Sequence, residues 1–422
     1  MSTTSTTSYQ YDRLMHPILI AGCLIIMISF AIRSSFGLFQ IPVADEFGWL
    51  RSQFSLAIAI QNLFWGIGQP MFGALAEKYG DRKAIVAGIF CYALGLFLSA
   101  FAITPGQHQL LEMVIGFGIA GTGFGLILAI VGRATSDRHR SVALGITTAA
   151  GSVGQLIGPP VAQSLLASMP WQEVFMVFAG IILVTLLFVK RLKVPKPTVA
   201  SNTAADEPLG VVVKRAVKDP TFIFLFVGFF SCGYQLAFIT AHFPALITEM
   251  CSAISPASLI QSLGVTTTSG LGAMAIALIG LANIGGTILA GWLGNRYSRK
   301  YLLASIYALR TLISVIFIMN PITPEAVVLF SILMGALWLA TVPLTAGLIG
   351  HIYGLKYMGT LYGLVFLSHQ IGGFLGVWLG GALYDYYGDY IMVWWIGIAV
   401  GLFSALIHLP VKERPQTSVA VT

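Results

Sequence analysis

Two arginines lie inside long apolar segments, where a positive charge is costly. Arg33 comes sixteen residues after Pro17, the start of the first apolar run, and Arg310 comes ten residues after Lys300. On a helix these spacings correspond to about 24 Å and about 15 Å. An arginine at the centre of a bilayer costs about 2.5–3.5 kcal/mol on insertion scales. Residues kept at that cost need a partner, and a guanidinium fork suits a carboxylate. Both positions are therefore predicted to bind an anion.

A structural role stays open for each arginine. Arg33 could form an ion pair with Glu112, at the outer end of the fourth apolar run, and Arg310 could bond carbonyls or polar side chains. No aspartate or glutamate lies deep in an apolar run. An anionic substrate is a natural missing partner, and it is favoured for Arg33 more than for Arg310.

Two histidines are candidates for proton coupling. His369 lies about ten residues into the eleventh run and is also a candidate substrate contact, while His242 lies near the outer end of the seventh. A buried histidine can titrate near neutral pH, although it can also remain neutral and hydrogen-bonded inside the bundle. Asn62, Tyr234 and Asn283 are further candidate substrate contacts, and the alternative for each is a packing bond between helices.

The elements that must position these residues are membrane helices. Hydrophobic residues make up 57% of the 422-residue chain and charged residues 9%, whereas soluble domains average about 25% charged residues. Crossing a bilayer takes about 20 apolar residues per helix. The sequence predicts an all-α membrane protein with twelve transmembrane helices, at 17–40, 52–76, 84–104, 109–132, 142–166, 172–190, 220–247, 270–293, 301–319, 325–350, 357–384 and 390–410.

One long polar stretch divides the twelve helices into two six-helix bundles. With the N-terminus inside, 20 of the 23 lysines and arginines fall on inner segments, as the positive-inside rule requires. This predicts cytoplasmic termini in a cell (plasma or inner) membrane, and it explains the net charge of +7 without nucleic acid. The predicted divisions are a tail at 1–16, a bundle at 17–190, a linker at 191–219, a bundle at 220–411 and a tail at 412–422.

A repeated loop supports two equivalent halves. Residues 73–83 read GALAEKYGDRK and residues 291–300 read GWLGNRYSRK, an offset of 291 − 73 = 218 residues. Each copy joins the end of one predicted helix to the start of the next. Parallel repeats of this kind are related by an axis along the membrane normal, and such transporters bind substrate between the halves near the midplane.

The first copy resembles the signature loop of the major facilitator superfamily. The matching residues are Gly73, Leu75, Glu77, Gly80, Arg82 and Lys83, while Asp81 stands where the family usually has a base. The resemblance implies the major facilitator fold, a monomer, and alternating access by rocking of two halves. It also implies that this loop latches the cytoplasmic side in the outward-facing state. Glu77 would carry that role, with Arg82 and Arg133 as ionic partners.

Within the superfamily the chain resembles the monocarboxylate and oxalate–formate branch. The residues that carry this resemblance are Arg33-Ser-Ser-Phe-Gly-Leu-Phe39, Ser141-Val-Ala-Leu-Gly-Ile146, Gly154-x-x-x-Gly158-Pro159 and Gly380-Gly-Ala-Leu-Tyr-Asp385. Two features differ from the branch: residues 270–293 hold no charge, and His369 stands where oxalate carriers have a lysine. The resemblance implies transport of small organic anions.

Other chemistry is not indicated by the sequence. Gly116-Phe-Gly-Ile-Ala-Gly121 has the spacing of a dinucleotide-binding loop, but it lies inside an apolar run rather than between a strand and a helix. The chain contains no Gly-Lys dipeptide and no H-E-x-x-H motif, and its four cysteines lie far apart. We therefore expect no enzyme activity, no cofactor, no metal and no ATP-driven pumping.

The leading hypothesis is a secondary active transporter of monocarboxylates or short dicarboxylates, working by proton symport or anion exchange. Arg33 would hold the carboxylate and His369 would provide proton linkage or a second polar contact. One alternative is proton-coupled efflux of drugs or metabolites, because the glycine-rich fifth helix partly resembles the antiporter pattern. Another is a non-transporting membrane receptor or scaffold on the same fold.

Overall fold

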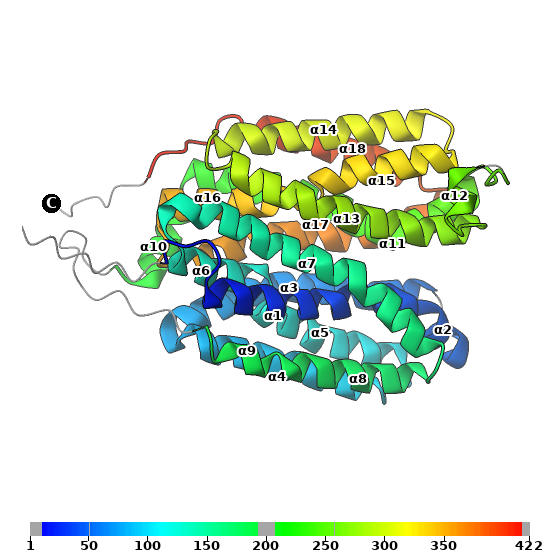
Figure 1. Cartoon of the computed structure of the whole chain (residues 1–422), viewed down its shortest axis with the longest axis horizontal. Helices are drawn as coiled ribbons and strands as arrows, with labels where there is room; N and C mark the ends of the chain where they lie inside the picture. The colour runs from blue at the N-terminus through cyan, green and yellow to red at the C-terminus, as the bar shows by residue number, and fades with distance from the viewer. Residues whose placement is uncertain (1–10, 50, 193–206, 257, 416–422) are drawn as a thin grey trace, which may run out of the picture.

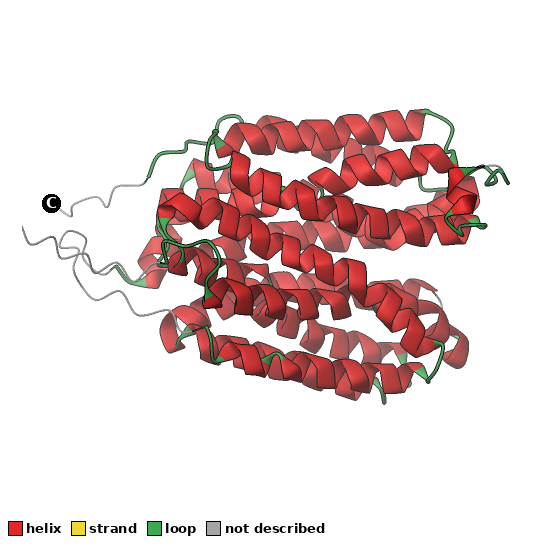
Figure 2. Cartoon of the chain, viewed as in Figure 1, coloured by secondary structure: helices red, strands yellow, loops and turns green. Residues whose placement is uncertain are grey.

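The computed structural model describes residues 11–49, 51–192, 207–256 and 258–415. Within these ranges the regular structure is helical, with one isolated bridge between Tyr11 and Thr135 (Figure 2). Most helices run along the long axis of the molecule, side by side (Figure 1). The described start and the described end of the chain, Tyr11 and Pro415, lie at the same end of the bundle, which we name the terminal end; the opposite end is the far end.

The first half of the chain supplies ten helical elements. They are α1 (Pro17–Ser34), η1 (Phe36–Phe39), α2 (Gln40–Phe47), α3 (Arg51–Tyr79), α4 (Asp81–Ser99), α5 (Pro105–Thr122), α6 (Phe124–Ala134), α7 (Asp137–Leu166), α8 (Trp171–Val184) and α9 (Leu186–Val189). The second half supplies α10 (Leu209–Ala216), α11 (Pro220–Met250), α12 (Leu259–Ser262), α13 (Thr268–Leu293), α14 (Arg299–Met319), α15 (Pro324–Leu337), α16 (Thr341–Tyr353), α17 (Met358–Tyr387) and α18 (Ile391–Ile407).

Each of the twelve predicted spans corresponds to one helix or to two consecutive helices, and the predicted fold class is confirmed. Ten helical segments of the described chain are long and apolar enough to cross a membrane, and α18 is a shorter apolar helix. The remaining span, α3, is long but more polar, and its Gln61, Asn62 and Gln69 are buried against protein. Its polarity follows from its central position, since it packs along α17, α5 and α4.

Several spans begin with the same local signal. Thr104, Asp219 and Thr323 each accept a hydrogen bond from a backbone N–H of the helix that follows, and each precedes a proline. A short polar N-cap satisfies donors that the first turn leaves free, and proline at the first helical position loses no hydrogen bond. These signals explain why the helices start within a few residues of the hydrophobic boundaries.

Two predicted continuous spans are broken in the middle. The run 109–132 divides into α5 and α6 at Gly123, which has extended backbone angles, and the run 325–350 divides into α15 and α16. An amide side chain compensates each break: Gln69 Nε2 donates to Ala120 O at 3.0 Å, and Asn283 Oδ1 accepts from Leu339 N at 2.9 Å. Membrane helices tolerate breaks only where such partners exist.

The two halves meet along two seams, α3 with α17 and α7 with α13. Glycines allow backbone contact at both. A Cβ on Gly73 would lie 2.6 Å from the Gly359 carbonyl carbon, and a Cβ on Gly145 would lie 2.8 Å from Thr287 O. Small residues bring helices this close in membrane proteins. Both contacts belong to the terminal end of the bundle, so the halves are tightly packed there.

Candidate substrate and gating sites

Arg33 is held by neutral groups. Its Nη2 donates to Asn62 Oδ1 at 2.7 Å, and its Cζ lies 4.7 Å from the centroid of the Trp65 ring. Its Nε is buried and has no hydrogen-bond partner among the described residues. The structure therefore brings together Arg33 of α1 and Asn62 of α3, two predicted substrate contacts, and leaves the guanidinium charge without a carboxylate beside it.

Glu112 is not the partner of Arg33. Its Oε2 accepts from Gln61 Nε2 at 2.6 Å, and its Oε1 lies 3.5 Å from His108 Nε2. Glu112 is 0% exposed; it lies within the first two turns of α5, at the outer end of its span as expected, but it is enclosed by protein. The sequence analysis missed this acid–histidine pair. Its signal was the spacing of four residues in the first two turns of α5, which places both side chains on one helix face.

Arg310 is 0% exposed on α14. Its Nη1 lies 3.4 Å from Cys232 Sγ, and its Cζ lies 5.9 Å from the centroid of the Tyr307 ring. Its Nε and Nη2 have no hydrogen-bond partner among the described residues. A thiol is a weak acceptor. The second intramembrane arginine is therefore also without a carboxylate in the described structure.

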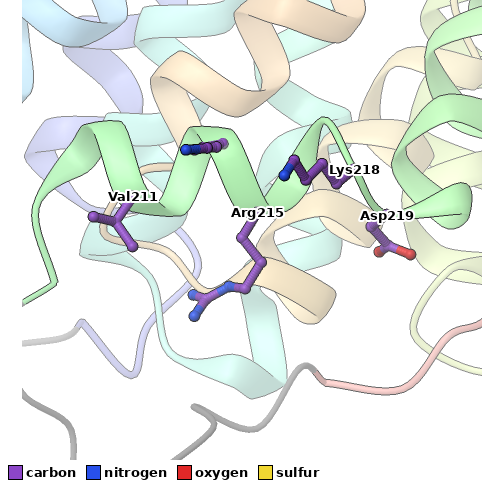
Figure 3. Close-up of a pocket in the computed structure, with 5 residues that line it drawn as sticks. Val211, Arg215, Lys218 and Asp219 are labelled. Carbon is purple, nitrogen blue, oxygen red and sulfur yellow. The ribbon is translucent and has the colours of Figure 1, made fainter. Parts of the chain in front are cut away.

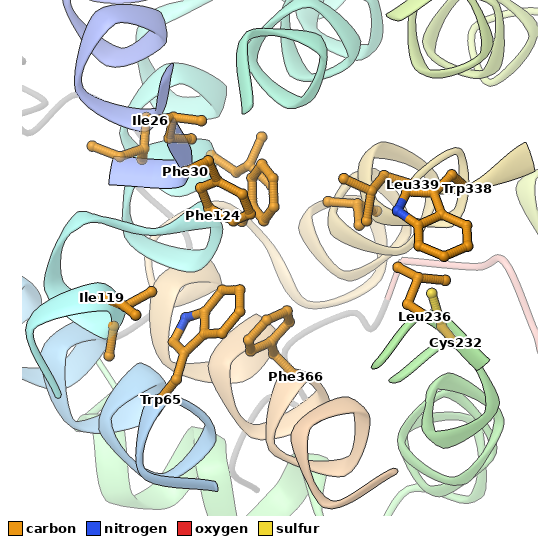
Figure 4. Packing of buried hydrophobic residues seen from close by; sticks show 14 of the residues in the cluster. Ile26, Phe30, Trp65, Ile119, Phe124, Cys232, Leu236, Trp338, Leu339 and Phe366 are labelled. Carbon is orange, nitrogen blue, oxygen red and sulfur yellow. The ribbon is translucent and has the colours of Figure 1, made fainter. Parts of the chain in front are cut away.

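His369 of α17 packs against side chains that lead to both intramembrane arginines. Its Nδ1 is 3.0 Å from Gln370 Oε1, and Nε2 has no partner among the described residues. The imidazole stacks on Phe366, with ring centroids 4.9 Å apart, and Phe366 lies 4.9 Å from Trp65 of the other half. Figure 4 shows Trp65 and Phe366 facing one another, with Cys232 across from them.

These side chains form a continuous polar and aromatic path between the halves. It runs from Arg33 over Trp65 and Phe366 to His369, and Cys232 lies within electrostatic reach of both His369 and Arg310. We name this set the central cluster: Arg33, Asn62, Trp65, Phe366, His369, Cys232 and Arg310. It carries two guanidinium groups and no carboxylate.

Two predicted substrate contacts, Asn283 and Tyr234, and the proton-coupling candidate His242 have their polar atoms engaged in helix packing. Asn283 Nδ2 donates to Ser152 Oγ at 2.6 Å, in addition to its bond with Leu339. The Tyr234 hydroxyl donates to Val393 O at 3.2 Å, and His242 Nε2 lies 2.9 Å from Val377 O. These are the packing roles that the sequence left open. The structure does not bring these side chains into the central cluster.

The predicted gating loop closes the α3–α17 seam, but not through the predicted ion pairs. Glu77 Oε2 accepts from Thr360 Oγ1 at 2.7 Å, and Oε1 accepts from Thr360 N at 3.2 Å, in the first turn of α17. Arg133 Nη2 instead lies 2.5 Å from Asp81 Oδ1, and Arg82 donates to Lys190 O. Glu77 forms no ion pair within the described chain.

The preference of Glu77 for the start of α17 over an arginine has a simple physical cause. The free N–H groups and the dipole of a helix N-terminus attract an anion, so Glu77 bonds the first turn of α17, while the Arg133 charge acts on it without an ion-pair contact. Asp81, the first residue of α4, forms the ion pair with Arg133 that was expected of Glu77. Gly80 has φ +102° and permits the turn between α3 and α4, while Lys83 is exposed. The loop thus presents one carboxylate to the opposite half.

Replacing Glu77 with glutamine is expected to weaken closure of the terminal end. An anion in the first turn of a helix contributes about 0.3–1 kcal/mol, and up to about 2 kcal/mol when partly buried. The ratio of closed to open protein should therefore fall by a factor between about two and thirty. Distances between spin labels on α3 and α17 would measure it. Lys78→Gln, an exposed change on the same helix, is the control, and equal distributions in both variants would contradict the role.

The second seam uses the repeated loop differently. A Cβ on Gly291 would lie 2.6 Å from Ser141 O, which mirrors the contact of Gly73. Asn295 occupies the region equivalent to Glu77, and its Nδ2 lies 3.4 Å from Arg138 O. The amide acts as a donor to a carbonyl, whereas Glu77 accepts from an N–H and a hydroxyl. The α7–α13 seam is therefore close-packed without a buried charge.

The described part of the predicted linker is docked on the second half. It contains α10, which lines a surface pocket with Val211, Lys214, Arg215, Lys218 and Asp219 (Figure 3). Arg215 Nη2 forms an ion pair with Glu207 Oε2 at 2.7 Å, and the Tyr353 hydroxyl donates to Asp219. The pocket lies at the polar terminal end and is separate from the central cluster.

A helical bundle of two similar halves, joined at glycine seams around a buried polar centre, is the architecture of a secondary transporter. The profile of the Major Facilitator Superfamily matches residues 22–250 and 240–421. The chain belongs to this superfamily. Its members are transporters rather than enzymes, so the expectation of no enzyme activity is confirmed, as is a multi-pass membrane protein.

Relatives support the predicted branch. An uncharacterised transporter of this superfamily from Bacillus subtilis, YcxA, is 27% identical over 394 residues, covering 89% of this chain and 90% of the relative. Monocarboxylate transporter 13 from Bos taurus is 25% identical over 378 residues, covering 86% and 80%. The Escherichia coli fucose:proton symporter FucP has a similar fold, with a TM-score of 0.66, 17% identity and coverage of 94% and 99%. The chain resembles the monocarboxylate branch, as predicted.

Proposed function

We propose that this protein is a secondary active transporter of small organic anions, monocarboxylates or short dicarboxylates. The observation that carries the proposal is the neutral environment of Arg33. Its guanidinium is held by an amide and an aromatic face, and its Nε has no partner among the described residues. A fixed charge of this kind is costly in a membrane unless something compensates it, and a substrate carboxylate does so. Similarity to a monocarboxylate transporter supports the same substrate class.

The proposed cycle is alternating access between bundles 17–190 and 220–411 of a monomer. The terminal end is proposed to be cytoplasmic, in agreement with the distribution of lysine and arginine, in a plasma or inner membrane. Glycine seams and the Glu77 cap close this end. An anion would enter from the far end, bind at Arg33 beside Trp65, and leave after the terminal end opens. Two modes of coupling remain as candidates: symport with a proton, and exchange for a counter-anion, with His369 available to the substrate.

Arg310→Gln is expected to weaken anion binding without abolishing transport. The Arg310 guanidinium lies against the Cys232 side chain. We therefore expect it to attract the bound anion at long range rather than to contact it. Two unit charges separated by about 10 Å interact by about 1.7 kcal/mol at an effective dielectric of about 20, so an attraction over that range would be worth roughly one order of magnitude in affinity. Competition by unlabelled anion would measure it. An unchanged affinity in the folded variant would show that Arg310 is structural, and Lys300→Gln at the helix start provides the charge-matched control.

Uptake into liposomes tests the proposal directly. Purified protein would be reconstituted and offered labelled acetate, lactate, pyruvate, oxalate and malonate, with and without an inward proton gradient. Uptake that increases with the gradient would indicate symport, and uptake that requires internal anion would indicate exchange. Folded protein that moves none of these anions would contradict the proposal. Proton-coupled efflux of another solute would then lead, followed by a receptor or scaffold role.

A further inference from the structure

A buried acid–base pair lies next to the Arg33 site and has no role in the account above. Glu112 is 0% exposed and His108 is 1% exposed, both on α5. The Glu112 Oε1 atom lies 3.5 Å from His108 Nε2, and neither atom has a hydrogen-bond partner in the described structure. Aromatic side chains cover the imidazole: Phe54 at 5.3 Å, Trp49 at 5.9 Å and Phe175 at 6.4 Å between ring centroids. The pair can bind or release a proton in an enclosed place.

Two consecutive residues of α3 connect this pair to Arg33. Gln61 donates to Glu112 at 2.6 Å, and Asn62 accepts from Arg33 at 2.7 Å. Any movement of Arg33 toward a bound anion therefore acts on the segment that also holds Glu112. The two sites share one short stretch of backbone, and both belong to the same half of the protein.

Among the side chains that the structure describes, few charged or titratable groups surround Glu112. On its own helix it faces His108, and from α3 it receives the neutral amide of Gln61. From α4 the buried Tyr92 phenol lies within electrostatic reach of both Glu112 and Arg33, the cation of α1. From α8 the nearest ring is Phe175, and Glu46 of α2 is bonded to Trp171 and Gln172 instead. Arg33 and Glu112 make no direct contact, and the phenol of Tyr92 is their shared neighbour.

We propose that Glu112 and His108 form the proton-binding site of this transporter, coupled through Gln61 and Asn62 to the anion at Arg33. The inference rests on the proposed function. In the empty state, the Glu112 carboxylate and the Arg33 guanidinium sum to zero charge. A bound carboxylate brings the sum to −1, and one proton taken from the far side onto the pair restores zero. His108 accepts or donates that proton at Nε2, and release on the terminal side returns both ions.

Neutrality explains why the two ions would move together. A net charge in a low-dielectric bundle carries a large desolvation cost, so the empty and fully loaded states reorient, whereas a state with the anion alone does not. A neutral side chain at position 112 imitates the protonated acid permanently. Such a variant should exchange anion for anion but should no longer use a proton gradient.

The test compares two transport modes in proteoliposomes, with lactate as the first probe and the other panel anions in parallel. One mode is accumulation driven by an inward proton gradient, and the other is exchange of external label for internal unlabelled anion at equal pH. Glu112→Gln is expected to lower gradient-driven accumulation at least tenfold and to keep exchange within about twofold of wild type. The control is Glu173→Gln, an exposed acid at the start of α8, which should retain both modes.

Each outcome decides the inference. Gradient-driven accumulation retained in Glu112→Gln would overturn it. If that variant performs neither mode, Glu112→Asp, which keeps a carboxyl group, should restore both; exchange without gradient response in the aspartate variant would overturn it as well. Wild-type protein that exchanges anions but ignores a proton gradient would overturn the proton site while leaving anion transport intact. Wild-type protein that moves no anion would instead refute the proposed function.

Discussion

Arg33→Gln is expected to abolish organic-anion uptake while leaving folded protein in the membrane. A charge-assisted hydrogen bond contributes about 1.5–3 kcal/mol, so loss of a two-bond contact with a carboxylate costs about 3–6 kcal/mol, or more than a hundredfold in transport at low substrate. The glutamine can still bond Asn62, which should preserve the α1–α3 contact seen for Arg33.

Uptake of the labelled anion and thermal unfolding would be measured on the same preparation. Arg33→Lys keeps the charge but cannot present a fork to a carboxylate, and it should give intermediate uptake. Arg191→Gln, an exposed position after α9, is the charge-matched control. Uptake near the wild-type rate by Arg33→Gln would remove Arg33 from the substrate site and make its bond to Asn62 purely structural.

Gly73→Val is expected to stop transport by preventing closure of the terminal end. Even a Cβ at this position would lie 2.6 Å from backbone atoms of Gly359 and Thr360 in the other half. Backbone cannot move aside as a flexible side chain can, so the two halves must separate. The steric conflict exists only when the seam is closed, and the variant should therefore fold and remain open at that end.

Spin-label distances across the α3–α17 seam, measured together with uptake, would distinguish this result from misfolding. The matched control is Gly180→Val on α8, because a Cβ at Gly180 meets no atom within 4 Å. It should transport normally. A closed-seam distance in Gly73→Val would show that the helices can shift to accept the side chain, and the close approach would then have no role in gating.

The helix pattern was readable from the sequence because membrane thickness imposes it. Twelve apolar runs and their flanking cations were sufficient to place the helices. The breaks at Gly123 and around Leu339 were not predicted, although glycines surround the first and Pro343 follows the second within about one turn. They depend on Gln69 and Asn283, which compensate the backbone from neighbouring helices. Such partners are a property of the assembled bundle.

The sequence predicted which residues form the candidate sites, but it did not predict which residues they contact. Arg33 and Asn62 were each selected for a polar group in an apolar setting, yet their contact joins two helices. Glu77 was selected from its loop, but its partner Thr360 lies 283 positions away. Glu112 was predicted at the outer end of its span, but its pairing with His108 was not, because the aromatic rings that enclose His108 come from other segments. The sequence around this pair does not indicate which distant segments enclose it.

The two seams differ in a way that ionic strength should reveal. The α3–α17 seam is closed by a carboxylate against a helix N-terminus, an attraction that salt screens, whereas the α7–α13 seam is closed by glycine packing and an amide–carbonyl contact. Added salt would weaken the α3–α17 seam and leave the α7–α13 seam in place. The two halves would then separate along the α3–α17 seam, and the uncharged α7–α13 seam would act as the hinge. Such a hinge motion differs from a symmetric rocking of the two halves.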